Sequence, residues 1–326
     1  MTVKIATISF LLIVLSLAVS NPSQKLRGNL TNLTAQTENQ DKKNTMQRIL
    51  DDSAKLEKLA GNFQFIEGPI WHPDGFLLFS DIPANIIYKF ASNQQVEVFR
   101  SPSGKANGNT LDKENRLLTG EHENRRVSRT EKDGKVITLA DRYEGKRLNS
   151  PNDLVVKSDG SIYFTDPSYG VSKDQEELGF YGVYRLAPDG KLTLLVKDLV
   201  LPNGIAFSPD EQKLYVNNSE AGYIAVFDIK PDGTVTNQQR FAELKDASQG
   251  GVPDGLKVDV EGNVYSTGPG GVWIFSPDGK LLGKISVPET ATNLAWGESD
   301  RKTLYITGST SLYRIRLKIA GVRAGK

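Results

Sequence analysis

The sequence predicts an all-β protein, a six-bladed β-propeller with four antiparallel strands in each blade and an N-terminal strand that completes the last blade. The first observation is a sixfold repeat, in which a polar residue opens an apolar stretch and a second apolar stretch follows it. The six opening residues are Glu67, Asn109, Asn152, Asn203, Asp254 and Asn293. They follow one another at intervals of roughly 40 to 50 residues, which is the length of a propeller blade.

Two further observations support this fold. Short β-rich stretches alternate with turns built on Pro-Asp-Gly or its variants, in which proline presets one φ angle and glycine accepts a positive one. After residue 53, no stretch of about twelve residues shows a helical period of 3.6. The last repeat is one strand short, so a segment near residues 55–60 is expected to supply its fourth strand and close the ring. A β-sandwich or several separate β domains remain alternatives.

The first 52 residues differ from the rest of the chain. Residues 1–20 carry one lysine and then an apolar run, and small residues precede Asn21, as in a cleaved signal peptide. An uncleaved membrane anchor is the alternative. Residues 21–52 are polar and are predicted to be a disordered tether. The propeller domain is expected over 53–320, with the protein exported to a periplasm or secreted and not inserted in a membrane after the signal is removed.

The amino-acid composition limits the partners, metal sites and reactive groups that the chain can have. The chain has 40 Lys and Arg against 39 Asp and Glu, so no net field favours a nucleic acid partner. It has no cysteine and two histidines, which excludes disulfides, thiolate zinc sites and three-histidine zinc sites. Any reaction must therefore use carboxylates, amides, hydroxyls, Arg or Lys. The oligomeric state is left open.

Four of the opening residues offer oxygen atoms that suit a hard cation. Glu67 and Asp254 supply carboxylates, and Asn152 and Asn203 supply amide oxygens. Calcium takes six to eight oxygen ligands in loosely defined geometry, so Ca²⁺ is the expected ion, with Zn²⁺, Mn²⁺ and Mg²⁺ as alternatives. The competing interpretation is that Asn-Gly and Asp-Gly are ordinary turns and that the channel holds only water.

Four motifs then resemble the gluconolactonase and regucalcin family over roughly residues 55 to 317. They are EGPIW at 67–71, the run from Arg147 to Gly170, PNGIAFSPD at 202–210 and PDGLKVDVEGNVY at 253–265. The resemblance implies a six-bladed propeller that binds one divalent metal and hydrolyses sugar lactones. It also implies that Glu67, Asn203 and Asp254 bind the metal, while Asn152 binds metal or substrate.

The resemblance implies a mechanism as well. The metal would polarise the lactone carbonyl, and Asp254, ionised beside the cation, would activate the attacking water as general base or attack directly. Asn149, Arg147 and His122 are candidates to hold substrate hydroxyls, although Arg147 could be a surface arginine and His122 a structural histidine. Asp153 is expected to face away from the site. The alternatives are a phosphotriester or aryl-ester hydrolase of the same fold, or a non-enzymatic, metal-stabilised binding propeller.

Overall fold

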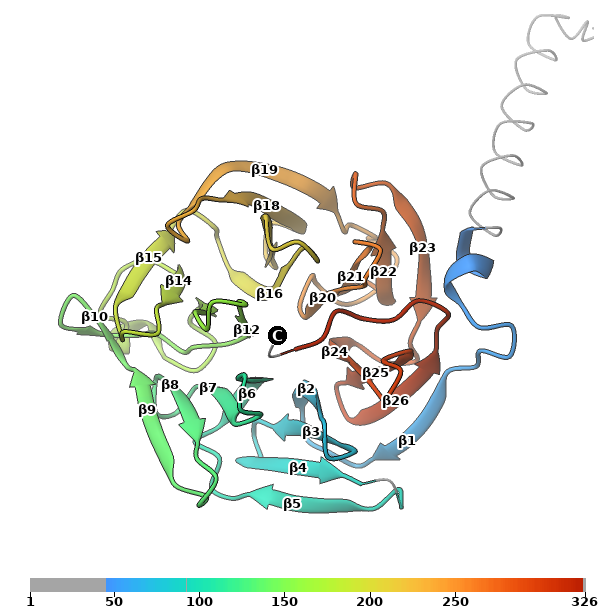
Figure 1. The fold of residues 1–326 in the computed structure, drawn as a ribbon, viewed down its shortest axis with the longest axis horizontal. Coiled ribbons are helices and arrows are strands. Elements are labelled where there is room, and N and C mark those ends of the chain that lie inside the picture. The colour runs from blue at the N-terminus through green and yellow to red at the C-terminus, as the bar shows by residue number, and fades with distance from the viewer. Residues whose placement is uncertain (1–44, 92, 325–326) are drawn as a thin grey trace, which may run out of the picture. The chain divides into compact units, whose positions relative to one another are not determined.

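The computed structural model describes residues 45–91 and 93–324. Their strands form six four-stranded antiparallel sheets arranged in a ring (Figure 1). Residues of the inner strands line a cavity, the central channel of the propeller. This confirms the predicted all-β, six-bladed propeller. The predicted signal peptide (1–20) and residues 21–44 of the predicted tether lie outside the described residues. No helix among the residues that the structure describes is long and apolar enough to cross a membrane.

Blades one to five each use four consecutive strands, with the innermost strand first. Blade one contains β2 (Ile66–His72), β3 (Phe76–Asp81), β4 (Ile86–Phe90) and β5 (Val96–Arg100). Blade two contains β6 (Ala106–Leu111), β7 (Leu117–Glu121), β8 (Arg126–Thr130) and β9 (Val136–Ala140). Blade three contains β12 (Leu154–Val156), β13 (Ile162–Asp166), β14 (Gly182–Leu186) and β15 (Leu192–Val196).

The next two blades repeat this order. Blade four contains β16 (Pro202–Phe207), β17 (Lys213–Asn218), β18 (Tyr223–Ile229) and β19 (Val235–Glu243). Blade five contains β20 (Leu256–Val258), β21 (Val264–Gly268), β22 (Gly271–Phe275) and β23 (Leu281–Ser286). Small elements outside the blades include a hairpin of β10 (Arg142–Tyr143) and β11 (Lys146–Arg147), and the 3₁₀ turn η1 (Lys173–Gln175).

Blade six is assembled from both ends of the chain, as predicted. Its inner strands are β24 (Ala291–Gly297), β25 (Thr303–Gly308) and β26 (Ser311–Arg316), and its outer strand is β1 (Glu57–Gly61). The β1 strand runs antiparallel to β26, and an ion pair joins Glu57 to Arg314 at 2.9 Å. This pairing closes the ring and leaves the outer edge of blade six short.

Residues 45–52 belong to the predicted tether, and the structure shows their contacts with the propeller. Residues 45–49 form a short helical turn, and Ile49 is 2% exposed within the core of blade six. Leu50 forms a β-bridge with Leu317. Met46, Ile49 and Leu50 thus pack with the core that blades five and six share.

Apolar side chains on both faces of each sheet pack against the neighbouring blades. The three tryptophans belong to this packing. Trp71 of blade one stacks on Tyr305 of blade six at 5.6 Å between ring centroids. Trp296 is 8% exposed in the core between blades five and six, and Trp273 packs against the core between blades four and five. None of these rings therefore needs a role as a sugar platform.

Where the inner strands begin, each blade lies close against the next. The backbone N–H groups of Gly108, Gly204 and Gly255 donate to the carbonyl oxygens of Asn152, Asp254 and Thr292, each in the following blade, at 2.7–3.1 Å. A methyl group on any of these glycines would collide with that following blade. The Asn-Gly and Asp-Gly pairs are therefore sites of close blade contact rather than turns, which corrects the alternative interpretation given above.

Candidate functional site

Six residues occupy equivalent positions where the inner strands open. The equivalence follows from the register. Ile66, Ala106, Pro202 and Ala291 pair with the corresponding ends of their second strands, and the register shifts directly after Ala106, Pro202 and Ala291 and one residue later, after Glu67, in blade one. A β-bulge at such a shift re-aims the side chains beside it. The six equivalent residues are Glu67, Asn107, Asn152, Asn203, Asp254 and Thr292.

Two of the predicted opening residues are corrected by this register. In blade two the equivalent of Glu67 is Asn107, not Asn109, and in blade six it is Thr292, not Asn293. Asn109 and Asn293 lie slightly further along their strands and brace the ring. Asn109 donates to Gly68 O at 2.9 Å and to Ser80 Oγ at 2.8 Å.

Glu67 and Asp254 form a repelling pair of carboxylates. Glu67 is 2% exposed, and its Oε2 accepts hydrogen bonds from Gly68 N at 2.7 Å and Asn293 Nδ2 at 2.9 Å. Burial raises the pKa of Glu67 to about 7, with Asp153 adding to the rise. Asp254 keeps part of its surface exposed, but its carboxyl group lies deep in the channel. Burial, then Glu67 and then Asp153 raise the pKa of Asp254 well above its ordinary value.

The two amide residues of the predicted set lie on the same ring. Asn203 is 3% exposed, its Nδ2 lies 3.2 Å from the hydroxyl of Tyr169, and its side chain also hydrogen bonds with Asp254. Asn152 is 3% exposed, and its backbone joins Thr165 of its own blade and Gly108 of blade two. The structure thus brings Glu67, Asn203 and Asp254 into mutual contact or electrostatic range and puts Asn152 at the equivalent position of blade three.

Tyr169 is a site residue that sequence reasoning missed. It belongs to the loop after β13 and is 46% exposed, yet its hydroxyl group reaches Asn203. Burial, with Asp254 next, raises the pKa of its hydroxyl to about 12, so Tyr169 is a neutral hydrogen-bond donor beside the carboxylates. It lies in the SIYFTDPSYG segment, but a loop conformation of this kind leaves no periodic signal in the sequence.

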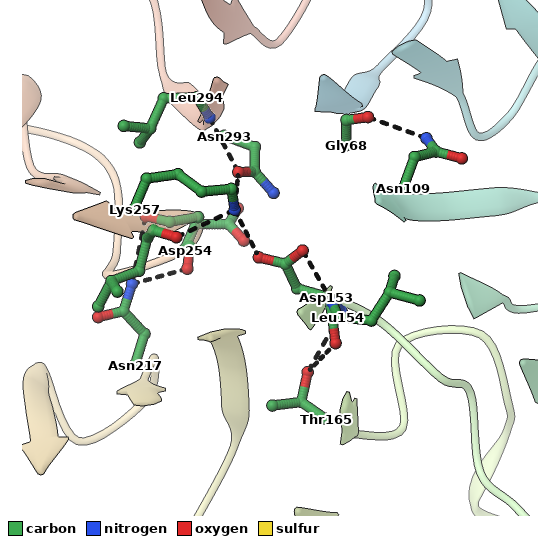
Figure 2. A network of polar contacts seen from close by, with 12 residues as sticks. Gly68, Asn109, Asp153, Leu154, Thr165, Asn217, Asp254, Lys257, Asn293 and Leu294 are labelled. Atoms are coloured by element: carbon green, nitrogen blue, oxygen red, sulfur yellow. Dashed lines mark hydrogen bonds and ion pairs between the residues drawn. The ribbon is translucent and has the colours of Figure 1, made fainter. Parts of the chain in front are cut away.

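Asp153 and Lys257 lie inside the channel as well (Figure 2). Asp153 is 1% exposed and its Oδ2 lies 3.3 Å from Lys257 Nζ, so the expectation that Asp153 faces away was wrong. The same ammonium donates to Asn293 Oδ1 at 3.4 Å and Leu256 O at 3.0 Å. No pattern in the sequence points to Lys257, because a lysine on a strand usually faces solvent.

His122 lies next to one of the six strand-opening residues, Asn107, and its side chain is buried. The imidazole is 4% exposed, and its Nε2 accepts a hydrogen bond from Asn107 Nδ2 at 3.2 Å. Burial lowers the pKa of His122 to about 4, so the ring is neutral and carries its proton on Nδ1. This bond leaves Asn107 Oδ1 as the free end of the amide, and that buried oxygen has no hydrogen-bond partner.

The other two predicted substrate residues precede β12, with Arg147 at the end of β11 and Asn149 in the loop that follows it. Asn149 is fully buried, and its Nδ2 donates to Asp166 O at 3.1 Å and Phe180 O at 3.0 Å, which leaves its Oδ1 unpartnered. The Arg147 guanidinium donates to Asn124 O at 3.2 Å, and its backbone N–H donates to Glu177. These contacts hold the loop against blades two and three, and a substrate role for either residue stays a prediction.

The donor set at the mouth fits a hard divalent cation. Its atoms are carboxylate and amide oxygens, and the two buried carboxylates repel each other when both are ionised. No three Asp, Glu, His or Cys side chains within 45–91 and 93–324 are grouped to hold a metal, so the amide oxygens would have to contribute. A cavity of about 490 Å³ lies further along the channel, where later residues of the inner strands, Lys257 and the tail 322–324 line it.

Comparisons with known proteins agree with this geometry. Residues 65–310 match the family described as SMP-30/Gluconolactonase/LRE-like region. The gluconolactonase of Zymomonas mobilis is 37% identical over 300 residues, which cover 84% of each chain. The gluconolactonase structure from Xanthomonas campestris has a TM-score of 0.78 at 38% identity and covers 83% of this chain and 92% of that one.

A more distant structure shares the fold. The regucalcin from Agrobacterium tumefaciens, described as a calcium-binding protein, has a TM-score of 0.67 at 19% identity, covering 81% of this chain and 92% of that one. At that identity the likeness concerns the fold alone. The family match extends over most of the propeller, from the first inner strand to the last blade. The chain therefore belongs to the SMP-30/gluconolactonase/LRE-like family.

Proposed function

We propose that this chain is a lactonase, an enzyme that hydrolyses the internal carboxylic ester of small lactones, with sugar lactones such as gluconolactone as its substrates. The name and the extent of the Zymomonas mobilis relative support this activity. The observation that carries the proposal is the meeting of Glu67, Asn203 and Asp254 at one end of the channel. A propeller that only presents a face to partners has no need of buried carboxylates there.

We further propose that the site works with one divalent cation, Ca²⁺ in the first place, held by Glu67, Asn152, Asn203 and Asp254. Such an ion, when bound, supplies positive charge beside the carbonyl oxygen of the lactone. The protein alone keeps the pKa values of Glu67 and Asp254 high, chiefly because burial penalises their charged forms and also because neighbouring carboxylates repel them. A cation that both carboxylates share would remove this repulsion, so the predicted ionised Asp254 depends on it.

Asp254 is the proposed general base. Its backbone is fixed from two sides, since its carbonyl oxygen accepts from Gly204 N at 2.8 Å and from Asn217 Nδ2 at 2.7 Å. The carboxyl group can therefore keep one orientation while it takes a proton from the attacking water. Direct attack by the carboxylate is the alternative, and trapping a covalent ester with a slow substrate would distinguish the two.

Substrate hydroxyl groups have two partners at the mouth. The Tyr169 hydroxyl is neutral and partly exposed, so it can donate. The free Oδ1 of Asn107 can accept, because His122 holds the amide nitrogen. Tyr169 lies within electrostatic range of Asp254, and Asn107 occupies the position next to Glu67 and Gly68, which suits a polyhydroxylated ring better than an apolar ester.

The test is hydrolysis of glucono-1,5-lactone by the purified chain, followed as acid release in weak buffer, before and after EDTA and with Ca²⁺ added back. We expect loss of activity with EDTA and recovery with Ca²⁺. Asp254→Asn should lower kcat by ~10²- to 10⁴-fold, the usual contribution of a general base. Full turnover after complete metal removal would refute the metal requirement, and faster hydrolysis of an aryl ester or a phosphotriester would refute the lactone assignment.

We also propose that the protein is exported, on the basis of the apolar segment in residues 1–20. Expression of the full chain in a bacterial host, followed by cell fractionation and N-terminal sequencing, tests this. A mature chain that starts at Asn21 in the periplasm or medium is expected. A chain that keeps its first residues and stays with the membrane fraction would instead identify an anchor.

A further inference from the structure

We propose that Lys257 is the resident counter-ion of the channel mouth, and that it sets the net charge of the mouth to match a single divalent cation. Lys257 lies on β20, three residues after Asp254, and its side chain crosses the channel toward blade three. The inference rests on the proposed cation site. It goes beyond that site by assigning a role to a residue outside the set of four ligands.

The Lys257 ammonium is held in a fixed place. A lysine ammonium has three N–H donors, and here three acceptors lie around it: Asp153 Oδ2 at 3.3 Å, Leu256 O at 3.0 Å and Asn293 Oδ1 at 3.4 Å. Figure 2 shows the ammonium between Asp153 and Asn293. With all three donors occupied, Lys257 has none left for substrate, which points to an electrostatic role rather than a catalytic one.

The charges around this ammonium add up to the charge of a divalent ion. Asp254 interacts electrostatically with Glu67 and Asp153, and Glu67 interacts with Asp153 and Lys257. Three carboxylates and one ammonium leave the ionised mouth with two negative charges. Without Lys257 the same carboxylates would carry three negative charges, and the attraction for Ca²⁺ would exceed the charge that one divalent ion neutralises.

Lys257 also orients one of the proposed ligands. Because Asn293 Oδ1 faces the ammonium, its Nδ2 is turned toward Glu67 and donates to Oε2 at 2.9 Å. Gly68 N occupies the same oxygen at 2.7 Å. Both donors therefore contact Oε2, and the hydrogen bonds that hold Glu67 leave Oε1 as the oxygen available to a cation.

The test is a charge cycle, read as Ca²⁺ affinity by isothermal titration calorimetry at pH 8 on wild type, Lys257→Met, Asp153→Asn and the double variant. Lys257→Met should tighten Ca²⁺ binding by ~10-fold or more, and Asp153→Asn should weaken it by a similar factor. The double variant restores the net charge and should return to within ~3-fold of wild type. Lys257→Arg is the matched control, and it should bind Ca²⁺ like wild type.

The outcomes separate the possible roles. If Lys257 only holds the structure together, Lys257→Met will weaken Ca²⁺ binding and the double variant will be weaker still, which would overturn the inference. Melting temperatures of all variants identify any that fail to fold, and Lys257→Arg then still tests the charge. If wild type binds Ca²⁺ but the variants do not show the expected order of affinities, the counter-ion role of Lys257 is refuted and the proposed cation site is not. No Ca²⁺ binding in wild type refutes the proposed cation site and the inference together.

Discussion

Replacing His122 by glutamine should change how the stability of the protein depends on pH. The imidazole is almost fully buried and accepts a hydrogen bond from Asn107, and burial lowers its pKa from 6.5 to about 4. Between pH 6.5 and pH 4 the unfolded chain binds a proton that the folded protein does not. The free energy of unfolding of wild type therefore falls as the pH falls through this interval.

The magnitude follows from the two pKa values. One pH unit corresponds to about 1.4 kcal/mol, so a pKa of about 4 in place of 6.5 costs about 3 kcal/mol once the pH reaches 4. At pH 5 the loss is about 2 kcal/mol. Glutamine keeps an acceptor for Asn107 and has no proton to gain, so His122→Gln lacks this loss.

The assay is urea denaturation of both proteins in EDTA at pH 7.5 and pH 5. At pH 7.5 we expect His122→Gln to be the less stable protein because it packs less well. At pH 5 the difference between the two should shrink by about 2 kcal/mol. Other titrating groups, including Asp166, whose pKa burial raises to about 7, are common to both proteins and cancel in the difference.

A stability difference that stays the same at both pH values would refute the reasoning, because it would mean that His122 has the same pKa in the folded and unfolded chain. A direct check is available from the small number of histidines. The variant His72→Gln leaves one imidazole, and its NMR titration should show a midpoint near pH 4.

Three further predictions concern the ring, the mouth and the domain boundary. Gly204→Ala should destabilise the protein by about 1–3 kcal/mol in urea denaturation, since the new methyl group meets the Asp254 carbonyl, while Gly250→Ala, with open space around it, should change little. Tyr169→Phe should raise KM for gluconolactone by ~2- to 10-fold with kcat and melting temperature nearly unchanged, and an unchanged KM would exclude the hydroxyl contact. Ile49→Ala should lower the free energy of unfolding by about 2–4 kcal/mol, whereas a tether residue would show no effect.

The fold was predictable because its information is repeated six times. Each inner strand opens with a polar residue, and in four of the blades a glycine follows it to make the contact with the next blade. The register in blade two could also have been read from Asn107-Gly108, which matches Asn203-Gly204. Asn109 was predicted instead, because the opening residue was defined as the polar residue next to the apolar stretch. The helical turn at 45–49 was not predicted, because a single buried isoleucine in a mostly polar stretch of sequence shows no helical pattern.

The contacts across the channel could not be predicted in the same way. Asp153 and Lys257 are 104 residues apart in the chain, and no local pattern states which long side chain turns inward. Tyr169 reaches Asn203 through a loop conformation that no period describes. Repeats thus define positions on the ring, while the charges that distinguish one position from another depend on side chains that meet only in the folded protein.

The composite blade six also determines when folding can finish. Blades one to five are built from consecutive strands, so each can pair soon after it is synthesised. The β1 strand has to wait for β26, and the ion pair between Glu57 and Arg314 spans 257 residues of chain. Such long-range pairing is slow, and until it happens the nascent chain exposes an unpaired edge. We therefore expect the docking of β1 to be the late step of refolding and the stage at which the chain most needs protection from aggregation.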